Sequence, residues 1–294
     1  MQLAANGEAG RAWLADLPRL IDELQQVWSI REIGVAYQGG CVAYVAPVVL
    51  ADGSRAALKI NLVDEETECE ADALAAWNGN GAARLLESDQ ARGAMLLERL
   101  EPGAALSEYP DRDEAIGIAC SLLRRLWKPA PDAHRFRLVT HLAQHYAQDL
   151  PAKYVKAGRP FEEGLLKRAV EFCHEFARSE SACVIANRDF HLGNVLAAER
   201  EPWLVIDPKP LAGEPAFDTG HLVRSLLPER IDARETARLI TTIAERLELP
   251  ARRVAEWIVV RSVDNALWAI STGRGDYRWD VACAEAAQRM FHLL

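Results

Sequence analysis

The chain has 294 residues, of which 50% are hydrophobic and 26% charged, and it carries a formal net charge of −9 at pH 7. This length is sufficient for one large domain or for two lobes with separate cores. The acidic balance argues against a nucleic-acid binder that works by neutralising phosphates. No stretch reaches the roughly 18 consecutive apolar residues of a membrane span. Because "MQLAANGEAG" also lacks the cationic start and apolar core of a secretory signal, the sequence predicts a cytoplasmic protein.

The first third of the chain predicts one helix and a small antiparallel sheet. In residues 14–28 the apolar side chains recur at helical spacing and share one face: Leu17, Leu20, Ile21, Leu24 and Trp28. Three strands are predicted next, over Ile30–Tyr37, Val42–Leu50 and Arg55–Val63. Gly39-Gly40 separates the first two strands. Asp52-Gly53 separates the last two and is a strong hairpin signal.

Long helical patterns dominate the rest of the chain. A helix is predicted over Glu65–Trp77, and short apolar runs follow at 83–86 and 94–97. From residue 111 onward, helices are predicted over 113–127, 136–154 with an interruption at Pro151, 162–179, 217–227, 233–247, 251–272 and 281–294. A short Pro/Gly-containing segment divides the two patterns. The sequence therefore predicts an α+β protein with an N-terminal lobe over 1–97, a hinge over 98–106 and a helical lobe over 107–294.

Polar side chains follow two apolar segments in the second half of the chain. Asp189 and Asn194 lie in a loop after "ACVI", and Asp207 ends the strand "WLVI". Magnesium prefers hard oxygen ligands of this kind. If the two segments are adjacent strands of a hairpin, Asn194 and Asp207 can share one metal ion while Asp189 reaches a substrate hydroxyl. Taken singly, each of these residues could instead serve an ordinary turn or strand end.

Lys59 stands among strand hydrophobics in "AALKI". A buried lysine is costly unless an anion meets it, so the sequence predicts an acidic partner. Glu70 on the following helix is the expected partner, although helical spacing also allows Glu66. A cation, metal ligands and a base for a hydroxyl are the components that phosphoryl transfer requires.

The segments "NRDFHLGNVL" and "IDPKPLAGEPAFD" together resemble the aminoglycoside phosphotransferase-like kinases, and most closely the streptomycin phosphotransferase and hydroxyurea antibiotic-resistance branch. The usual forms there are H-G-D-x-H-x-x-N-V-L and I-D-P-K-x-x-x-G-E-P-x-[FY]-D. "QGG", "ALKI" and "LLERL" also occur in the family's order, so the resemblance covers about residues 30–225. It implies a protein-kinase-like two-lobe fold that binds ATP and Mg²⁺ between the lobes. The reaction would transfer the γ-phosphoryl group to a hydroxyl of a small molecule.

The resemblance also implies a role for each matching residue. Asp189 would be the catalytic aspartate, and Asn194 and Asp207 would be the metal ligands. His191 belongs to the pattern and would structure the loop.

The nucleotide would be held by residues of the first lobe. Lys59 would contact its phosphates, with Glu70 orienting the lysine. The turn that contains Gly39 and Gly40 would cover the phosphates, and the backbone of the hinge from Glu98 to Leu100 would meet the adenine.

One departure from the family pattern bears on the acceptor. Asn187-Arg188 replaces the usual His-Gly before the catalytic aspartate. Asparagine can still bond to neighbouring backbone, but the bulkier Arg188 can alter the acceptor pocket. The expected acceptor is a cationic, hydroxylated small molecule of the streptomycin type, and hydroxyurea is a second one. The alternatives are a kinase for another metabolite and a nucleotide-binding pseudokinase. A protein kinase is disfavoured because the D-F-G and A-P-E elements are missing.

Other polar residues have weaker claims on function. No nucleic acid, membrane or obligate protein partner is expected. The six cysteines are scattered and are expected to be mostly buried thiols. His141 and His145 lack a third metal ligand. Glu214 and Asp218 are expected to cap or brace the helix near Phe217. Three further carboxylates lie among aromatic residues and could grip a cationic sugar or belong to a solvated helix tip: Asp264, Asp276 and Asp280.

Overall fold

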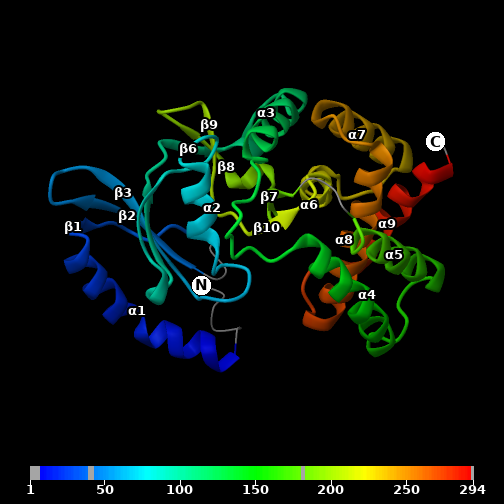
Figure 1. The fold of residues 1–294 in the computed structure, drawn as a ribbon, viewed down its shortest axis with the longest axis horizontal. Coiled ribbons are helices and arrows are strands. Elements are labelled where there is room, and N and C mark those ends of the chain that lie inside the picture. Colours follow the sequence, from blue (N-terminus) through cyan, green and yellow to red (C-terminus); the bar gives the residue numbers. More distant parts are fainter. Residues whose placement is uncertain (1–6, 39–42, 180–182, 293–294) are drawn as a thin grey trace. The chain divides into compact units, whose positions relative to one another are not determined.

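The computed structural model of the chain describes residues 7–38, 43–179 and 183–292, which fold into two compact units (Figure 1). The first unit comprises Met1–Ala104 and Leu196–Lys209, and the second comprises Ala105–Val195 and Pro210–Leu294. Residues 196–209, which the sequence pattern leaves within the helical lobe, thus group with the first unit. The reason is backbone pairing with a segment of the first unit that is distant in sequence. The Val205 N–H donates to the Gly81 carbonyl, and the Val205 carbonyl accepts from the Ala83 N–H.

An antiparallel sheet forms the centre of the first unit. Its strand order is β1–β2–β3–β5–β4, and the strands span Ile30–Ile33, Ala43–Leu50, Arg55–Asn61, Ala94–Glu98 and Leu85–Asp89 in that order. Lys59 lies on the central strand β3, opposite Val45 of β2 and Met95 of β5. A second sheet, β6–β8–β9, belongs mainly to this unit and contains Pro102–Ala105, Val195–Ala198 and Trp203–Val205.

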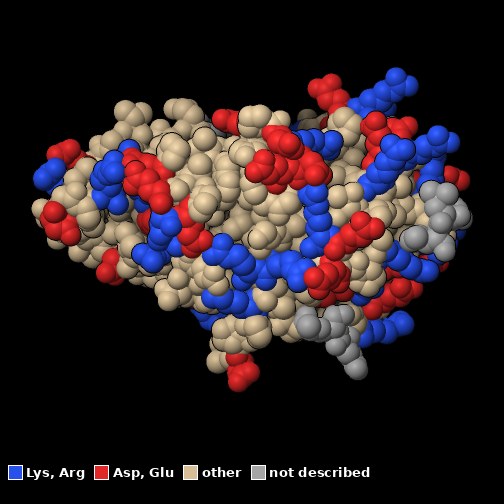
Figure 2. Space-filling view, turned by 90° about the horizontal axis from the view of Figure 1, so that it is seen from above, with Lys and Arg blue, Asp and Glu red and all other residues tan. Residues whose placement is uncertain are grey.

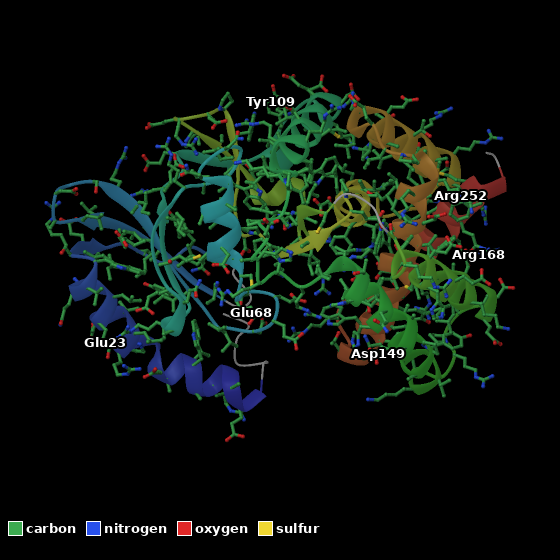
Figure 3. All side chains as sticks on the ribbon, viewed as in Figure 1. Glu23, Glu68, Tyr109, Asp149, Arg168 and Arg252 are labelled. Carbon is green, nitrogen blue, oxygen red and sulfur yellow. The ribbon has the colours of Figure 1, made fainter. Side chains whose placement is uncertain are left out.

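Helix α1, Gly7–Val27, covers the sheet with the apolar face that its periodicity predicts (Figure 1). Leu17, Leu20 and Leu24 are buried there against strand residues such as Leu58 and Ile60. Glu23, labelled in Figure 3, accepts a hydrogen bond from Arg92 of the short helix η2, Gln90–Arg92, at 3.1 Å. The Trp13 indole N–H also donates to the Asn61 carbonyl at 3.1 Å, so the helix is attached to its unit by an apolar stripe and by polar contacts.

Several elements differ from the prediction by a few residues, and three differences have an identifiable local cause. Strand β1 ends at Ile33 rather than at residue 37, because its partner β2 carries Pro47, which has no N–H for a regular ladder. Helix α2, Glu70–Trp77, begins five residues late, because the Asp64 carboxylate accepts from the backbone N–H groups of Glu66 and Thr67 and forms a turn. The predicted interruption at Pro151 is wrong, since α4 continues through it with Leu150 and Tyr154 buried.

The second unit is built mainly from helices. They are α3 (Arg112–Leu126), α4 (Val139–Lys156), α5 (Glu163–Phe176), α6 (Ala216–Leu226), α7 (Ala233–Leu247), α8 (Ala251–Thr272) and α9 (Tyr277–Arg289). A two-stranded antiparallel sheet pairs β7, Val184–Asn187, with β10, Pro210–Gly213. Short 3-10 helices are η3 (Leu106–Glu108), η4 (Leu192–Asn194) and η5 (Met290–His292). Strand β7 leads directly into the loop that contains Asp189.

Charged side chains of both signs are intermixed on the face shown in Figure 2. The net charge of −9 is therefore not gathered into one continuous acidic area on that face. Among the described residues, no helix combines the length and the apolar character that crossing a membrane requires.

Candidate functional site

Lys59 is buried in a set of polar contacts within the first unit. Its Nζ lies 2.6 and 2.8 Å from the two carboxylate oxygens of Glu70, and both residues are almost fully buried, at 4% and 1% exposure. Asn61, two positions further along the same strand face, donates to Glu70 at 2.9 Å. Of the two expected partners, Glu70 is therefore the one that pairs with Lys59, whereas a carboxylate oxygen of Glu66 lies 3.5 Å from Lys209 Nζ. The sequence did not single out Asn61, although its two-residue spacing from Lys59 was the available signal.

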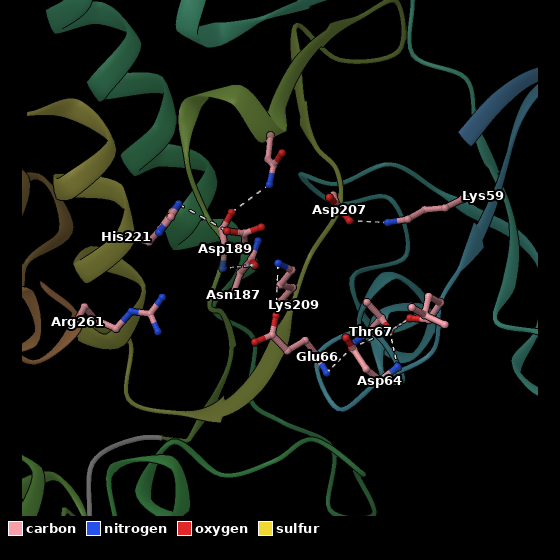
Figure 4. A network of polar contacts seen from close by, with 12 residues as sticks. Lys59, Asp64, Glu66, Thr67, Asn187, Asp189, Asp207, Lys209, His221 and Arg261 are labelled. Carbon is pink, nitrogen blue, oxygen red and sulfur yellow. Dashed lines mark hydrogen bonds and ion pairs between the residues drawn. The ribbon is translucent and has the colours of Figure 1, made fainter. Parts of the chain in front are cut away.

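A second carboxylate reaches the same ammonium group. Asp207 Oδ1 lies 2.5 Å from Lys59 Nζ (Figure 4), while the Asp207 side chain stays 49% exposed. Burial by itself would lower the pKa of Lys59, but the attraction of Glu70 and Asp207 outweighs it and raises that pKa above its usual value. Lys59 is therefore a fixed positive charge that is sealed on one side by Glu70 and open toward Asp207.

Asp207 has an unusual backbone conformation. It follows strand β9 with a φ of 51°, in the left-handed region that residues other than glycine seldom adopt. Such conformations persist where the surrounding structure enforces them, and they are concentrated at functional sites. Here Pro208 follows and is buried, so the chain turns sharply and the carboxylate projects toward solvent and Lys59.

Glu98 and Leu100 differ in whether their hydrogen-bonding groups already have partners. The Glu98 carboxylate accepts from Arg200 at 2.8 and 2.9 Å, and its backbone N–H donates to Arg84. Leu100 contrasts with it, because its backbone N–H donates to no other backbone group among the described residues. Gly39 and Gly40 lie outside the described residues.

The second unit contains the loop around Asp189. The Asp189 backbone N–H donates to the Asn187 side-chain oxygen at 3.1 Å, so the asparagine bonds to the loop backbone. Asn194 Nδ2 donates to the Asp189 carbonyl at 3.1 Å. Because the amide nitrogen is engaged, the Asn194 carboxamide presents its oxygen as the group for a cation. His191 Nδ1 accepts from the Gly193 N–H at 3.1 Å, which is a loop-structuring contact.

Asp218 attaches the start of this loop to two helices. It is 1% exposed and accepts from the Asn187 backbone N–H and from the Trp127 indole N–H, both at 2.8 Å. Burial raises the pKa of Asp218 to about 8, against the effect of these two donors. Glu214 accepts from Trp257 and Arg253 of α8, each at 2.8 Å. Neither side chain caps α6, so the two residues brace the fold rather than cap the helix.

The substitution Asp218→Ala should destabilise the chain. It removes the acceptor for one buried and one partly buried donor, which should lower the free energy of unfolding by about 2–4 kcal/mol. Urea denaturation measures the change. The matched control is Asp276→Ala, which removes an exposed N-cap of α9 and should cost about 1 kcal/mol. Equal losses in the two variants would contradict the assigned role of Asp218.

His221 of α6 is a site residue that the sequence did not reveal. Its Nε2 lies 3.5 Å from Asp189 Oδ1 (Figure 4), and its ring lies 5.3 Å from that of His191. Together the three side chains bring a carboxylate oxygen and two ring nitrogens within 4.8 Å of one another. His221 stands between Asp218 and Arg224 on its helix, and no motif in the sequence marks it.

The remaining candidates mostly have structural partners. Asp280 is buried and pairs with Arg224, and Asp276 accepts from the Arg278 N–H at the start of α9. Asp264 is 9% exposed and lies 3.5 Å from Lys153. Among the described residues, His141 and His145 gather no third metal ligand. The described cysteines are free thiols, all buried except Cys183. The carboxylates of Asp264, Asp276 and Asp280 are therefore not assigned to binding of the acceptor substrate.

The sequence matches a model of one protein family over most of its length. The matched family is "Aminoglycoside/hydroxyurea antibiotic resistance kinase", and the match covers residues 28–273. The streptomycin 6-kinase of Streptomyces glaucescens is 38% identical over 274 residues, which are 92% of this chain and 88% of that protein. The hydroxyurea phosphotransferase of Kitasatospora aureofaciens is 38% identical over 279 residues, 93% of this chain and 79% of that protein.

Solved structures of kinases are similar to this chain in fold. A thermostable mutant of an aminoglycoside phosphotransferase, in a ternary complex with AMP-PNP and hygromycin B, superposes with a TM-score of 0.64. It is 12% identical, and the alignment covers 93% of this chain and 98% of that one. The predicted α+β, protein-kinase-like fold, with a small antiparallel sheet and a mainly helical part, is confirmed.

Proposed function

The chain belongs to the aminoglycoside/hydroxyurea antibiotic resistance kinase family, and we propose that it phosphorylates a hydroxyl group of a streptomycin-like aminoglycoside. The chain is an ATP-dependent phosphotransferase that acts on a small molecule. The observation that carries the site assignment is the buried Lys59–Glu70 pair with Asp207 at its open side. A fixed cation beside a strand-end carboxylate is the arrangement that a metal–nucleotide complex requires.

Lys59 and Glu70 form the phosphate side of the proposed nucleotide site. Glu70 is sealed from solvent and keeps the lysine in one position, so the ammonium group meets phosphate oxygens without reorganisation. Asp207 occupies the exposed side of the ammonium group, where phosphate would bind. The turn with Gly39 and Gly40 stays the proposed cover of the phosphates.

The proposed adenine contact is the backbone of Leu100, whose N–H donates to no other backbone group among the described residues. Glu98 takes part only through its backbone, because Arg200 holds its carboxylate. A free backbone donor at this position suits the hydrogen-bonding edge of a purine base.

Magnesium fits the donors that the chain offers. Asp207 supplies an exposed carboxylate, and Asn194 supplies a carboxamide oxygen whose partner nitrogen is bonded to the loop. Both are hard oxygen ligands of the kind that Mg²⁺ takes together with phosphate oxygens. We therefore propose these two residues as the magnesium ligands. The bound ion would neutralise charge on the phosphates of ATP.

Asp189 is the proposed general base or positioner for the acceptor hydroxyl. Its backbone is held by Asn187 and Asn194, and its side chain stays partly exposed, at 24%. An aspartate in such a loop accepts the hydroxyl proton as the new oxygen–phosphorus bond forms. Positioning and charge neutralisation supply most of the acceleration, because the transition state is loose.

Magnesium-dependent ADP release should rise several-fold when streptomycin is added to the wild-type chain with ATP. Hydroxyurea is tested beside it, because the relative named for that acceptor has the same 38% identity as the streptomycin 6-kinase. Mass spectrometry of the acceptor should show one added phosphoryl group. Stimulation by a different hydroxylated metabolite alone would favour the metabolic-kinase alternative. Tight ATP binding without turnover on any acceptor would favour a pseudokinase.

A further inference from the structure

Helix α6 contacts the Asp189 loop at two alternate loop residues. Asp218 accepts from the Asn187 backbone N–H at 2.8 Å, and His221, three residues later on the helix, lies 3.5 Å from the Asp189 carboxylate. Residues three apart on a helix share one face. One helical face therefore holds both the start of the loop and the side chain of its proposed base. Asp218 contacts the loop backbone, whereas His221 lies beside the Asp189 carboxylate, which is the proposed base.

His221 lies in an environment that disfavours its charged form. Its side chain is 25% exposed, and the charged groups around it are Asp189 and His191 of the loop, Arg261 of α8 and Arg224 of its own helix. Burial, followed by the two arginines and His191, lowers the pKa of His221 to about 3, although Asp189 opposes this change. A neutral imidazole can donate one N–H to Asp189. It places no full positive charge beside the carboxylate, and such a charge would lower the basicity of Asp189.

Arg261 owes its place beside α6 to a glycine. A Cβ at Gly220 would lie only 2.8 Å from Arg261 Cγ and 3.4 Å from the Trp257 carbonyl oxygen, so only glycine permits this approach of the two helices. Arg261 is 6% exposed and donates to the Tyr146 hydroxyl at 3.0 Å. No carboxylate lies within ion-pair distance of its guanidinium among the residues that the structure describes. Its positive charge therefore acts on His221 in the direction opposite to that of Asp189.

We propose that His221 is a positioning residue for Asp189, whose imidazole orients the carboxylate toward the acceptor hydroxyl, and that burial, assisted by the charge of Arg261, keeps this imidazole neutral. The inference rests on the proposed function of Asp189 as the base. The 3.5 Å distance is longer than a hydrogen bond, and catalytic contacts of this kind shorten when substrate binds.

Two substitutions separate positioning from packing. Glutamine places an N–H the same number of bonds from Cα as His221 Nε2, whereas phenylalanine keeps the ring and loses the donor. His221→Phe should lower kcat about 10- to 100-fold, with little change in ATP affinity, and His221→Gln should retain clearly more activity. The exposed His174 of α5 supplies matched controls, His174→Phe and His174→Gln, which should behave as wild type. Full activity in His221→Phe, or a lower activity in His221→Gln than in His221→Phe, would overturn the proposal.

The charge state of His221 is measured without turnover. In a chain with ¹³C-labelled histidine, the imidazole signal missing from His221→Gln should not titrate between pH 5 and 8. The signal should shift in Asp189→Asn. In Arg261→Met, which keeps most of the arginine stem, the pKa of His221 should rise relative to the wild type, because one of the positive charges that lower it is removed. Titration of the wild-type His221 signal near the ordinary histidine pKa of about 6.5 would overturn the proposal. So would a His221 signal that is unchanged in Asp189→Asn. These signals need no acceptor, so failure of the proposed function remains distinguishable from failure of this inference.

Discussion

Replacing Asp189 by alanine should lower kcat for phosphoryl transfer at least about 10³-fold while leaving ATP binding nearly unchanged. The loss follows because the acceptor hydroxyl would have no base and no oriented acceptor for its proton. ATP affinity should persist because Lys59 and Glu70 lie in the other compact unit and do not depend on this side chain. Steady-state kinetics gives kcat, and calorimetry with ATP and Mg²⁺ gives the affinity.

The control for this result is Asp132→Ala, which removes an exposed carboxylate outside the site and should retain wild-type kinetics. The variant Asp189→Asn serves a second purpose, because it keeps the size of the side chain and removes its charge. If Asp189→Ala retained a tenth of the wild-type rate, Asp189 would not be the base. If its ATP affinity fell in parallel with kcat, the effect would be structural.

The substitution Lys59→Met should both destabilise the chain and weaken nucleotide binding. It leaves the Glu70 carboxylate buried without its counter-charge, and breaking a buried ion pair in this way costs about 3–5 kcal/mol. Urea denaturation measures the stability, and calorimetry measures ATP affinity. Because burial then raises the pKa of Glu70 without opposition from Lys59, the native state binds more protons than the unfolded state. The stability of Lys59→Met should therefore rise as the pH falls toward the ordinary glutamate pKa of about 4.3.

The double variant Lys59→Met with Glu70→Gln separates the two effects. Removing both charges should restore most of the stability, since the side-chain amide introduced by Glu70→Gln keeps an oxygen that accepts from Asn61. ATP affinity should stay low, because the cation for its phosphates is still missing. Recovery of ATP affinity in the double variant would contradict the proposed role of Lys59. Failure to recover stability would show that the pair does more than neutralise charge.

Much of the fold follows from local patterns. The apolar face of α1, the hairpin at Asp52-Gly53 and the long helices of the second unit reflect periodicities that repeat over a few residues. The errors fall where a neighbour overrides the local pattern. Pro47 on β2 shortens the strand beside it, and burial on both sides of Pro151 carries α4 through a residue that disfavours helix. Element boundaries therefore depended on contacts that the sequence does not display.

The sequence alone determined the chemical inventory of this protein. The order of "ALKI", "NRDFHLGNVL" and "IDPKPLAGEPAFD" identified the family, and the cost of burying Lys59 pointed to an acidic partner such as Glu70. Only the tertiary structure decided between Glu70 and Glu66, and placed Asp207 against Lys59 across 148 positions of sequence. The contact between His221 and Asp189 likewise depends on the packing of α6 against the Asp189 loop, where Asp218 accepts from the Asn187 N–H. Residue types record which chemistry is possible, but contacts between distant segments arise from packing, which no local pattern encodes.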